Sequence, residues 1–516
     1  MMKLKLKRVV SLCLAVAMLC GLLTGCGGKS SGSQYKDNSD EKVTLKMAIP
    51  LQKQRDADAV LAEINKQLET LLPNTELEII WEGNMETKWS LWMATKEPID
   101  IAHSGFVTDL SGEVSKKSYM ALDSLIDEYA PNLKGQEEKY WYAYDTAKIG
   151  GQLYAVPNVQ IHINNVMTIE LAEDVIPYID TAALSAEGMS SDVTTEKFWQ
   201  ILDAGLDNAA ANGYDMKGKL GLEWRKIAQK GYIFIGGADS NICYRSNGDG
   251  EILDFYTTDE FKVYCDYMKK WADKDYVSRD ALTGNIGWWT RFMNPYYIED
   301  GATQCTGSSQ GWVNVIIEDY KNKVLTTDIG KVQTYWSVPF TAEHPARAIR
   351  FLDLLHSKEG AGIANLLAYG FEGTHYEFTD KENGDIEAFE YKGQGGSTVS
   401  YGVPSWYVTN MLQGLYNVAP YTHEYTAFAE HYYTNTVNKM DKNILYGFTF
   451  DTSSVKVPLS NILKNNAELA ANVYSGIVAN SEATYNELME KNKTAGIEDV
   501  ISTLQKQADD YKSSQK

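Results

Sequence analysis

A glycine-flanked serine is the first feature of this sequence that could do chemistry. Gly307-Ser308-Ser309-Gln310-Gly311 matches the G-x-S-x-G elbow, in which a strand-to-helix turn presents a serine nucleophile. Three histidines follow, so a Ser, acid, His order is available: His344, His356 and His375. Short Gly/Ser turns before helices also offer free backbone amides to polar ligands. We favour this second interpretation, with Ser308 and Ser309 as ligand contacts and no catalysis.

Other motifs fall short of metal or phosphate sites. His423-Glu424 begins a zinc-protease pattern, but Ala427 stands where the second histidine is required. The turn over 247–250 resembles part of a calcium loop, yet Arg245 and Tyr256 occupy its first and last ligand positions. We therefore predict a hairpin turn there, no metal and no cofactor. A glycosidase needs only two opposed carboxyl groups, and no local pattern singles out a pair.

Aromatic residues are the better candidates for ligand binding. The chain has 33 Tyr and 12 Trp, whose rings combine a flat apolar face with a polar group. Trp288 and Trp289 stand among glycines and asparagines, where exposure is costly unless something stacks on them. Trp312 follows the Gly/Ser turn, and Trp406 lies in Gly402-Val-Pro-Ser-Trp-Tyr. We predict that these four rings form platforms for sugars, with core packing as the alternative.

The N-terminus reads as a secretory signal that ends at a cysteine. Residues 1–8 are basic and residues 9–23 are apolar, too short for a comfortable membrane span. Leu23-Thr-Gly-Cys26 resembles the bacterial lipobox, after which the cysteine is acylated. Each buried acyl methylene contributes about 0.8 kcal/mol of membrane binding. We expect a bilayer anchor at Cys26 and a protein body outside the cytoplasm, with ordinary secretion as the alternative.

Charge and cysteine content narrow the possible partners. The formal net charge is −21, and loss of the basic leader makes it more negative. Such a chain repels nucleic acid, so we expect no nucleic-acid partner. Cys243, Cys265 and Cys305 lack C-x-x-C spacing and number three, which favours part-buried thiols over a disulfide framework or zinc site.

The pattern of elements indicates an α/β protein of two lobes, because about 490 mature residues exceed one core. Apolar residues alternate over 43–49, repeat at helical spacing over 60–72, and alternate again over 77–81, which predicts parallel β-α-β units. We expect a third short strand at 99–102 and a tight hairpin at 148–157. Further expectations are a strand at 302–306 with a helix at 312–323, and helices at 346–355 and 483–511.

Several stretches together resemble one family. The lipobox, Glu97-Pro-Ile-Asp-Ile-Ala102 and Gly150-Gly-Gln-Leu-Tyr-Ala-Val-Pro157 are similar to family 1 extracellular solute-binding lipoproteins of bacterial carbohydrate ABC importers. Three more stretches resemble one subgroup of that family: Tyr369-Gly-Phe-Glu-Gly-Thr-His-Tyr376, Tyr446-Gly-Phe-Thr-Phe-Asp-Thr-Ser453 and Ala495-Gly-Ile-Glu-Asp-Val-Ile501.

The resemblance implies a periplasmic-binding-protein-like fold of type II, in which hinge-linked lobes close around ligand. His103 and Ser104 would occupy a ligand-contacting loop, and Asn158 and Gln160 a first crossover. Tyr369 and Glu372 are further candidate contacts. The implied organisation is a signal peptide (1–25), a flexible tether (26–42), an N-lobe (43–156 plus about 339–410) and a C-lobe (157–338 plus about 411–516).

The function implied is capture of an oligosaccharide or related glycan and its delivery to membrane permease subunits, by a monomer without enzymatic activity. Two alternatives stay open. One is a lipid-anchored hydrolase that uses Ser309 or a carboxylate pair. The other is a peptide-binding lipoprotein of the same fold, which would need an ion pair for the ligand's termini.

Overall fold

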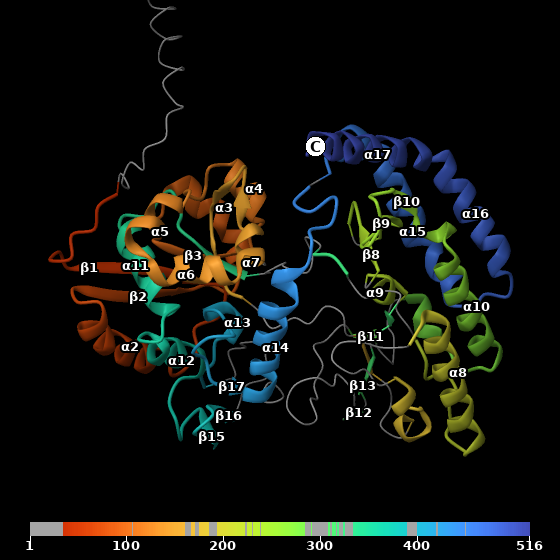
Figure 1. Cartoon of the computed structure of the whole chain (residues 1–516), viewed down its shortest axis with the longest axis horizontal. Helices are drawn as coiled ribbons and strands as arrows, with labels where there is room; N and C mark the ends of the chain where they lie inside the picture. The colour runs from red at the N-terminus through yellow and green to blue at the C-terminus, as the bar shows by residue number, and fades with distance from the viewer. Residues whose placement is uncertain are drawn as a thin grey trace, which may run out of the picture.

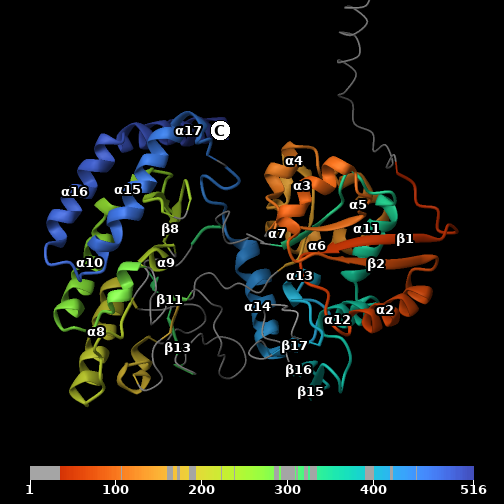
Figure 2. The ribbon, with the colours of Figure 1, turned by 180° about the vertical axis from the view of Figure 1, so that it is seen from behind.

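The computed structural model describes residues 35–105, 107–159, 167–170, 175–184, 193–221, 224–229, 231–237, 239–283, 290–291, 308–309, 312–315, 317–318, 323–325, 334–389, 400–418, 422–448 and 450–515. Two lobes lie side by side, and both views separate them (Figure 1, Figure 2). The described residues form one large buried apolar cluster in the N-lobe and two in the C-lobe.

The N-lobe is built on a five-stranded sheet of order β2-β1-β3-β14-β6. Its strands are β1 (Val43–Ile49), β2 (Thr75–Trp81), β3 (Ile101–Gly105), β14 (Thr334–Ser337) and β6 (Val156–Pro157). β1 runs parallel to β2 and β3, as the β-α-β pattern predicts, whereas β14 is antiparallel to both of its neighbours. Val43, Leu45 and Met47 are buried as their alternation requires.

Helices cover this sheet and extend the lobe. They are α2 (Ala57–Leu71), α3 (Met85–Thr95), α4 (Leu110–Ser115), α5 (Asp123–Tyr129), α6 (Pro131–Lys139), α7 (Trp141–Asp145), α11 (Pro345–Leu355), α12 (Ala361–Tyr369), α13 (Ser405–Val408) and α14 (His423–Asn435). Two small sheets complete it: β4 (Lys148–Ile149) with β5 (Gln152–Leu153), and β15 (Tyr376–Asp380), β16 (Asp385–Ala388) and β17 (Asn417–Val418). The β4-β5 turn has positive φ at Gly150 and Gly151, which confirms the predicted hairpin.

The C-lobe is mainly helical. Its helices are α8 (Thr195–Ala211), α9 (Trp224–Ala228), α10 (Asp259–Asp273), α15 (Lys456–Tyr474), α16 (Ser481–Thr494) and α17 (Ile497–Ser514). Its strands are β7 (Met167–Glu170), β8 (Tyr232–Phe234), β9 (Ile242–Arg245), β10 (Leu253–Asp254), β11 (Thr290–Arg291), β12 (Ser308–Ser309) and β13 (Trp312–Val315). The predicted turn over 247–250 joins antiparallel β9 and β10.

Two segments lie outside the lobe ranges that the family resemblance implied. β14 belongs to the N-lobe sheet and α14 packs in the N-lobe core, although both fall within the expected C-lobe ranges. All four residues of β14 are buried, because the strand fills the slot between β3 and β6. The last residues of the expected tether also contact the N-lobe, because the Asp37 carboxylate accepts hydrogen bonds from Arg347.

The segment expected to be a helix at 312–323 begins instead as strand β13. β13 pairs antiparallel with both β12 and β7. β-Branched Val313 and Val315 favour a strand there, and Ser309 pairs with Trp312 as in a hairpin. In the part of the chain that the structure describes, no helix has the length and apolar character needed to cross a membrane.

Candidate functional site

The point where the chain leaves the N-lobe sheet for the C-lobe brings several predicted residues together. His103 and Ser104 in β3 stand opposite Trp336 and Tyr335 in β14. Asn158 directly follows β6, and its backbone amide donates to the Thr334 carbonyl at 3.0 Å. Since β6 ends and β14 begins here, these side chains occupy the edge of the lobe from which the chain crosses.

Four aromatic rings contact one another in series at this edge, at tilted or edge-on angles. The ring centroids of His103 and Tyr407 are 4.3 Å apart, and those of Tyr407 and Trp406 are also 4.3 Å apart. Trp336 meets the other side of His103 edge-on, with centroids 5.4 Å apart. Helix α13 supplies Trp406 and Tyr407, and it lies on the side of the N-lobe that faces the C-lobe (Figure 1, Figure 2). We call His103, Trp336, Trp406 and Tyr407 the ring stack.

Only the outermost member of the ring stack reaches solvent. Trp406 is partly exposed, whereas His103 and Trp336 have no exposed surface and Tyr407 has 5%. Hydrogen bonds fix the backbone on which Trp406 sits: the Thr334 hydroxyl donates to the Trp406 carbonyl, and the Trp336 indole donates to the Val408 carbonyl at 2.9 Å. A rigid, half-open indole supported from behind by further rings is suited to stacking a flat ligand.

Burial determines the charge state of the ring stack. Removal from water lowers the pKa of His103 to about 3, so its imidazole is neutral at physiological pH. Neither ring nitrogen has a hydrogen-bond partner in the described chain, and the Asn158 Oδ1 atom is also buried without one. The Asn158 side-chain amide donates to the Tyr407 carbonyl at 3.0 Å. Unpaired buried polar groups cost about 1–3 kcal/mol each, so His103 and Asn158 are polar groups at this edge that a ligand could satisfy.

The remaining predicted N-lobe contacts have structural partners. The hydroxyls of Ser104 and Ser337 are hydrogen-bonded at 2.8 Å inside the sheet. Tyr369 is buried, and its hydroxyl donates to the Tyr416 carbonyl at 3.0 Å. Glu372 is exposed and accepts from Lys381 at 2.8 Å. Tyr369 and Glu372 do not join the ring stack, because they lie at the end of α12 and beside β15.

The predicted C-lobe contacts are seen only in part. Ser309 is paired with Trp312 across the β12-β13 hairpin, and Ser308 with Val313. A nucleophile elbow requires a strand-to-helix turn, so the backbone at Ser309 is not an elbow. Gln160, Trp288, Trp289 and Cys26 lie outside the described residues.

The three histidines that could have completed a triad are engaged in the N-lobe. His375 Nε2 lies 3.2 Å from an Asp56 carboxylate oxygen, and its Nδ1 accepts from the Phe371 amide at 2.9 Å. His356 is fully buried and its Nδ1 contacts the Leu352 carbonyl at 2.8 Å. His344 precedes helix α11. Ser309 lies in β12, in a sheet with β7, β11 and β13, whereas the three histidines lie at the ends of α11 and before β15 in the N-lobe.

One group of side chains has the composition of a metal site. The ligand atoms of Asp380, Asp385 and His423 lie within 4.8 Å of one another. Protein groups already use these atoms: both Asp385 oxygens accept from His423, from its amide at 2.8 Å and its Nδ1 at 2.7 Å. Asp380 accepts from Asn383. The arrangement serves to cap helix α14, and we assign no ion to it.

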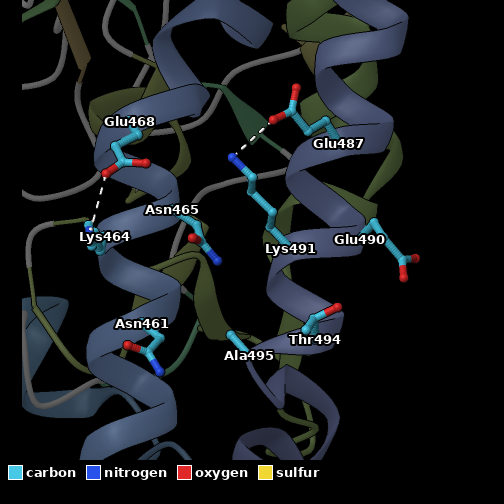
Figure 3. A pocket seen from close by; sticks show the side chains of 9 residues that line it. All are labelled: Asn461, Lys464, Asn465, Glu468, Glu487, Glu490, Lys491, Thr494 and Ala495. Carbon is cyan, nitrogen blue, oxygen red and sulfur yellow. Dashed lines mark ion pairs between the residues drawn. The ribbon is translucent and has the colours of Figure 1, made fainter.

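A groove of about 550 Å³ lies between α15 and α16. Figure 3 shows side chains from both helices around it, with ion pairs joining Lys464 to Glu468 and Lys491 to Glu487. Its lining has no aromatic ring: Asn461, Lys464, Asn465, Glu468, Glu487, Glu490, Lys491, Thr494 and Ala495. The groove is separate from the ring stack, because its helices belong to the C-lobe.

Sequence reasoning missed two members of the ring stack and its anchor. Tyr407 and Trp336 were not candidates, although Tyr407 is adjacent to the candidate Trp406. Thr334 stands far from both α13 and Asn158 in sequence. No local signal marks Thr334, because its role depends on β14 pairing with β3 and β6.

The architecture defines the class of the protein. Two lobes with separate cores, joined by crossing segments, have the fold of type II periplasmic solute-binding proteins. The chain superposes on the crystal structure of the N-glycan transport solute binding protein (NgtS) from Streptococcus pneumoniae with a TM-score of 0.67, at 18% identity over 92% of this chain and 100% of that one. The TM-score is 0.58 for NgtS in complex with Man1GlcNAc, at 19% identity over 91% and 99%.

Sequence comparison agrees with this classification. A carbohydrate ABC transporter substrate-binding protein of Streptococcus pneumoniae serotype 4 (strain ATCC BAA-334 / TIGR4) is 22% identical over 527 residues, which cover 96% of each chain. Residues 444–513 match the model of a domain of unknown function, DUF3502. The expected resemblance to extracellular solute-binding proteins of carbohydrate ABC importers is thereby confirmed.

Proposed function

We propose that this protein captures an oligosaccharide or related glycan between its two lobes and delivers it to the permease subunits of an ABC importer. The ring stack is the observation that carries the proposal. It ends in a half-open indole at the edge from which the chain crosses to the other lobe. The name of the carbohydrate-transport relative supports the same ligand class.

Stacking on Trp406 would supply the affinity. The C–H face of a sugar ring packs against an indole, while hydroxyl groups need polar partners nearby. We propose that Trp288, Trp289, Trp312, Gln160, Ser308 and Ser309 contribute further contacts to the ligand. Each hydroxyl left without a partner costs about 1–3 kcal/mol, so these polar groups would set specificity.

Closure of the lobes would let the permease distinguish the ligand-bound protein from the empty one. A ligand that bridges two lobes binds the closed arrangement more tightly than the open one and shifts the population toward it. Ligand would also stabilise the fold by mass action, by about 2.7 kcal/mol at one hundred times its Kd.

We propose that the protein acts as a monomer at the outer face of the cytoplasmic membrane, held by acylated Cys26. The signal-like leader and the lipobox support this location. A change at Cys26 should release the protein into the medium without altering glycan binding.

We propose that binding is not followed by catalysis. The hairpin geometry at Ser309 supports this, because it lacks the strand-to-helix turn of a serine hydrolase. Turnover of glycans or esters by the purified protein would overturn this part of the proposal.

Calorimetry on residues 35–516 tests the function. This span keeps Asp37, which pairs with Arg347. Titrants should include mannose- and GlcNAc-containing glycans, other oligosaccharides and short peptides. We expect saturable binding of a glycan with one site per chain. Binding of peptides alone, or of none of these ligands, would contradict the proposal.

A further inference from the structure

The segment that crosses between the lobes for the last time touches both of them. Leu445 is buried in a C-lobe cluster, whereas the next residue, Tyr446, packs against the N-lobe core. This crossing is also the start of the region that matches the domain of unknown function, residues 444–513.

Lys442 attaches the crossing to the N-lobe. Its Nζ atom lies 3.2 Å from the Asp145 carboxylate of α7. The same atom lies over two rings, 4.7 Å from the Trp141 centroid and 4.5 Å from the Tyr446 centroid. Helix α7 is fixed within the N-lobe, because Tyr142 stacks on Tyr433 of α14 with centroids 5.3 Å apart. Two groups of α7, the Asp145 carboxylate and the Trp141 ring, therefore attach this half-exposed cation to the N-lobe.

Tyr446 attaches the same crossing to the C-terminal helices. Its carbonyl accepts a hydrogen bond from the Tyr511 hydroxyl of α17 at 2.7 Å. Tyr511 also stacks on Phe448, with centroids 4.7 Å apart. The C-terminus of α17 lies beside this crossing in both views (Figure 1, Figure 2). The last helix of the chain thus reaches back to the start of its own region.

The C-terminal helices are in turn fixed to the body of the C-lobe. A chain of buried amides runs from α16 to β9: Asn492 donates to Asn466 at 2.9 Å, and Asn466 donates to Asn241 at 2.9 Å. Asn241 donates to the Asp254 carboxylate at 2.5 Å. These amide-to-amide hydrogen bonds join α16, α15 and the start of β9 in one buried polar network, which fixes how the helices pack on the C-lobe.

A second crossing is bonded to the last one. The Leu325 amide donates to the Asp441 carbonyl, and the Asn443 amide donates to the Leu325 carbonyl, each at 2.7 Å. The Asn443 side chain donates to the Ser246 carbonyl of the C-lobe at 2.6 Å. Residues 323–325 and 441–443 are therefore hydrogen-bonded to each other.

We infer that Trp141, Asp145, Lys442, Tyr446 and Tyr511 form a brace across the hinge. Through this hinge brace, the region of unknown function holds the crossing segments and so sets how freely the lobes move. The inference rests on the proposed function, since hinge freedom matters to a protein that closes on ligand. It gives the C-terminal helices a role in ligand capture although they lie far from the ring stack.

Hydrogen exchange of the ligand-free protein tests the brace directly. Lys442→Met removes the cation but keeps the aliphatic stem, and Tyr511→Phe removes only the hydroxyl. We expect amide exchange in 323–325 and 441–446 to become about threefold to tenfold faster in each variant. Lys439→Met is the matched control, because Lys439 is exposed in the same stretch of chain and bonds only locally, to Asn435. It should leave exchange unchanged.

The double variant distinguishes a single brace from two unrelated contacts. If Lys442 and Tyr511 act through Tyr446 as one unit, their effects should not add. Amide exchange in the double variant should then be little faster than in the faster-exchanging of the two single variants. Unchanged exchange at the crossings, or an equal increase throughout the chain, would overturn the brace. This experiment uses no ligand, so it is independent of the proposed function. If the protein binds no glycan, the hinge brace is not thereby contradicted, and normal glycan binding would not support the brace if the exchange rates stayed unchanged.

Discussion

Arg347 and Asp37 form an ion pair across 310 residues of sequence, with Nε 2.9 Å from Oδ1. Both side chains are almost fully buried, with 1% and 6% of their surface exposed. The guanidinium also donates to the Thr75 hydroxyl at 2.8 Å and to the Asn38 carbonyl at 2.7 Å. The segment that precedes β1 is thereby fixed to helix α11.

Asp37→Ala should destabilise the N-lobe by about 3–5 kcal/mol, because it leaves the buried Arg347 charge without its counterion. Urea unfolding measures the loss. Asp58→Ala is the control, since its pair with Lys53 is exposed and is worth at most about 1 kcal/mol. Equal losses in the two variants would show that Asp37 does not compensate Arg347.

Trp406→Ala should weaken glycan binding by about tenfold to a hundredfold, because a partly exposed aromatic anchor is removed from the ring stack. Calorimetry with the best glycan from the panel gives the change in Kd. Trp92→Ala is the matched control, since Trp92 is also partly exposed but lies on α3 and is not a member of the ring stack. Similar affinities for wild type and Trp406→Ala would remove Trp406 from the binding site.

Only part of the ring stack was predicted. Trp406 was expected to be a platform for sugars, and the family resemblance implied a ligand-contacting loop at His103 and Ser104 and a first crossover at Asn158. Their burial could not be foreseen, because β14 and α13 that cover them come 170 to 300 residues later. Long-range antiparallel pairing of β14 has no local signature.

The helix expected at 312–323 was wrong because the local sequence pattern is ambiguous. A Gly/Ser turn precedes both helices and hairpins, and periodicity over a few residues does not separate them. β13 became a strand because β7 offered a partner, with Val313 opposite Ile169.

Tyr369 was a candidate because of its motif, but that motif packs α12 against β17 through the Tyr369 hydroxyl.

His423 should stabilise the protein most at acidic pH. Its hydrogen bond to Asp385 raises the pKa of the imidazole in the folded state. The folded protein therefore binds the imidazole proton of His423 more tightly than the unfolded chain does. The resulting stabilisation is complete below the pKa of histidine in the unfolded chain, and it is lost as the pH rises through the higher pKa of the folded state.

His423→Gln should consequently lose stability at pH 5.5 and lose less at pH 8.5, as measured by urea unfolding. His431→Gln on the exposed side of α14 serves as the control and should show no such trend, because His431 contacts Asn435 and no carboxylate. A deficit of His423→Gln that is constant with pH would indicate packing rather than charge.

Asp254 should destabilise the C-lobe at neutral pH. Burial raises the pKa of its carboxyl group to about 6, against the lowering effect of hydrogen bonds from the Tyr256 amide and Asn241. The Oδ2 atom has no hydrogen-bond partner in the described chain. Because the folded state holds the proton more tightly than the unfolded state, stability falls as the pH rises from about 4 through about 6.

Asp254→Asn should therefore be more stable than wild type at pH 8, by up to about 3 kcal/mol, and the advantage should shrink as the pH falls toward 4. The amide oxygen can still accept from Asn241 and Tyr256, so the chain of buried amides that anchors α15 and α16 stays intact. Asp239→Asn is the control, since Asp239 is exposed on the loop before β9. Urea unfolding at several pH values measures the difference in stability between Asp254→Asn and wild type. If the variant is less stable than wild type at pH 8, the charged carboxylate holds the helices of the C-terminal region in place, and the cost of burying it does not dominate.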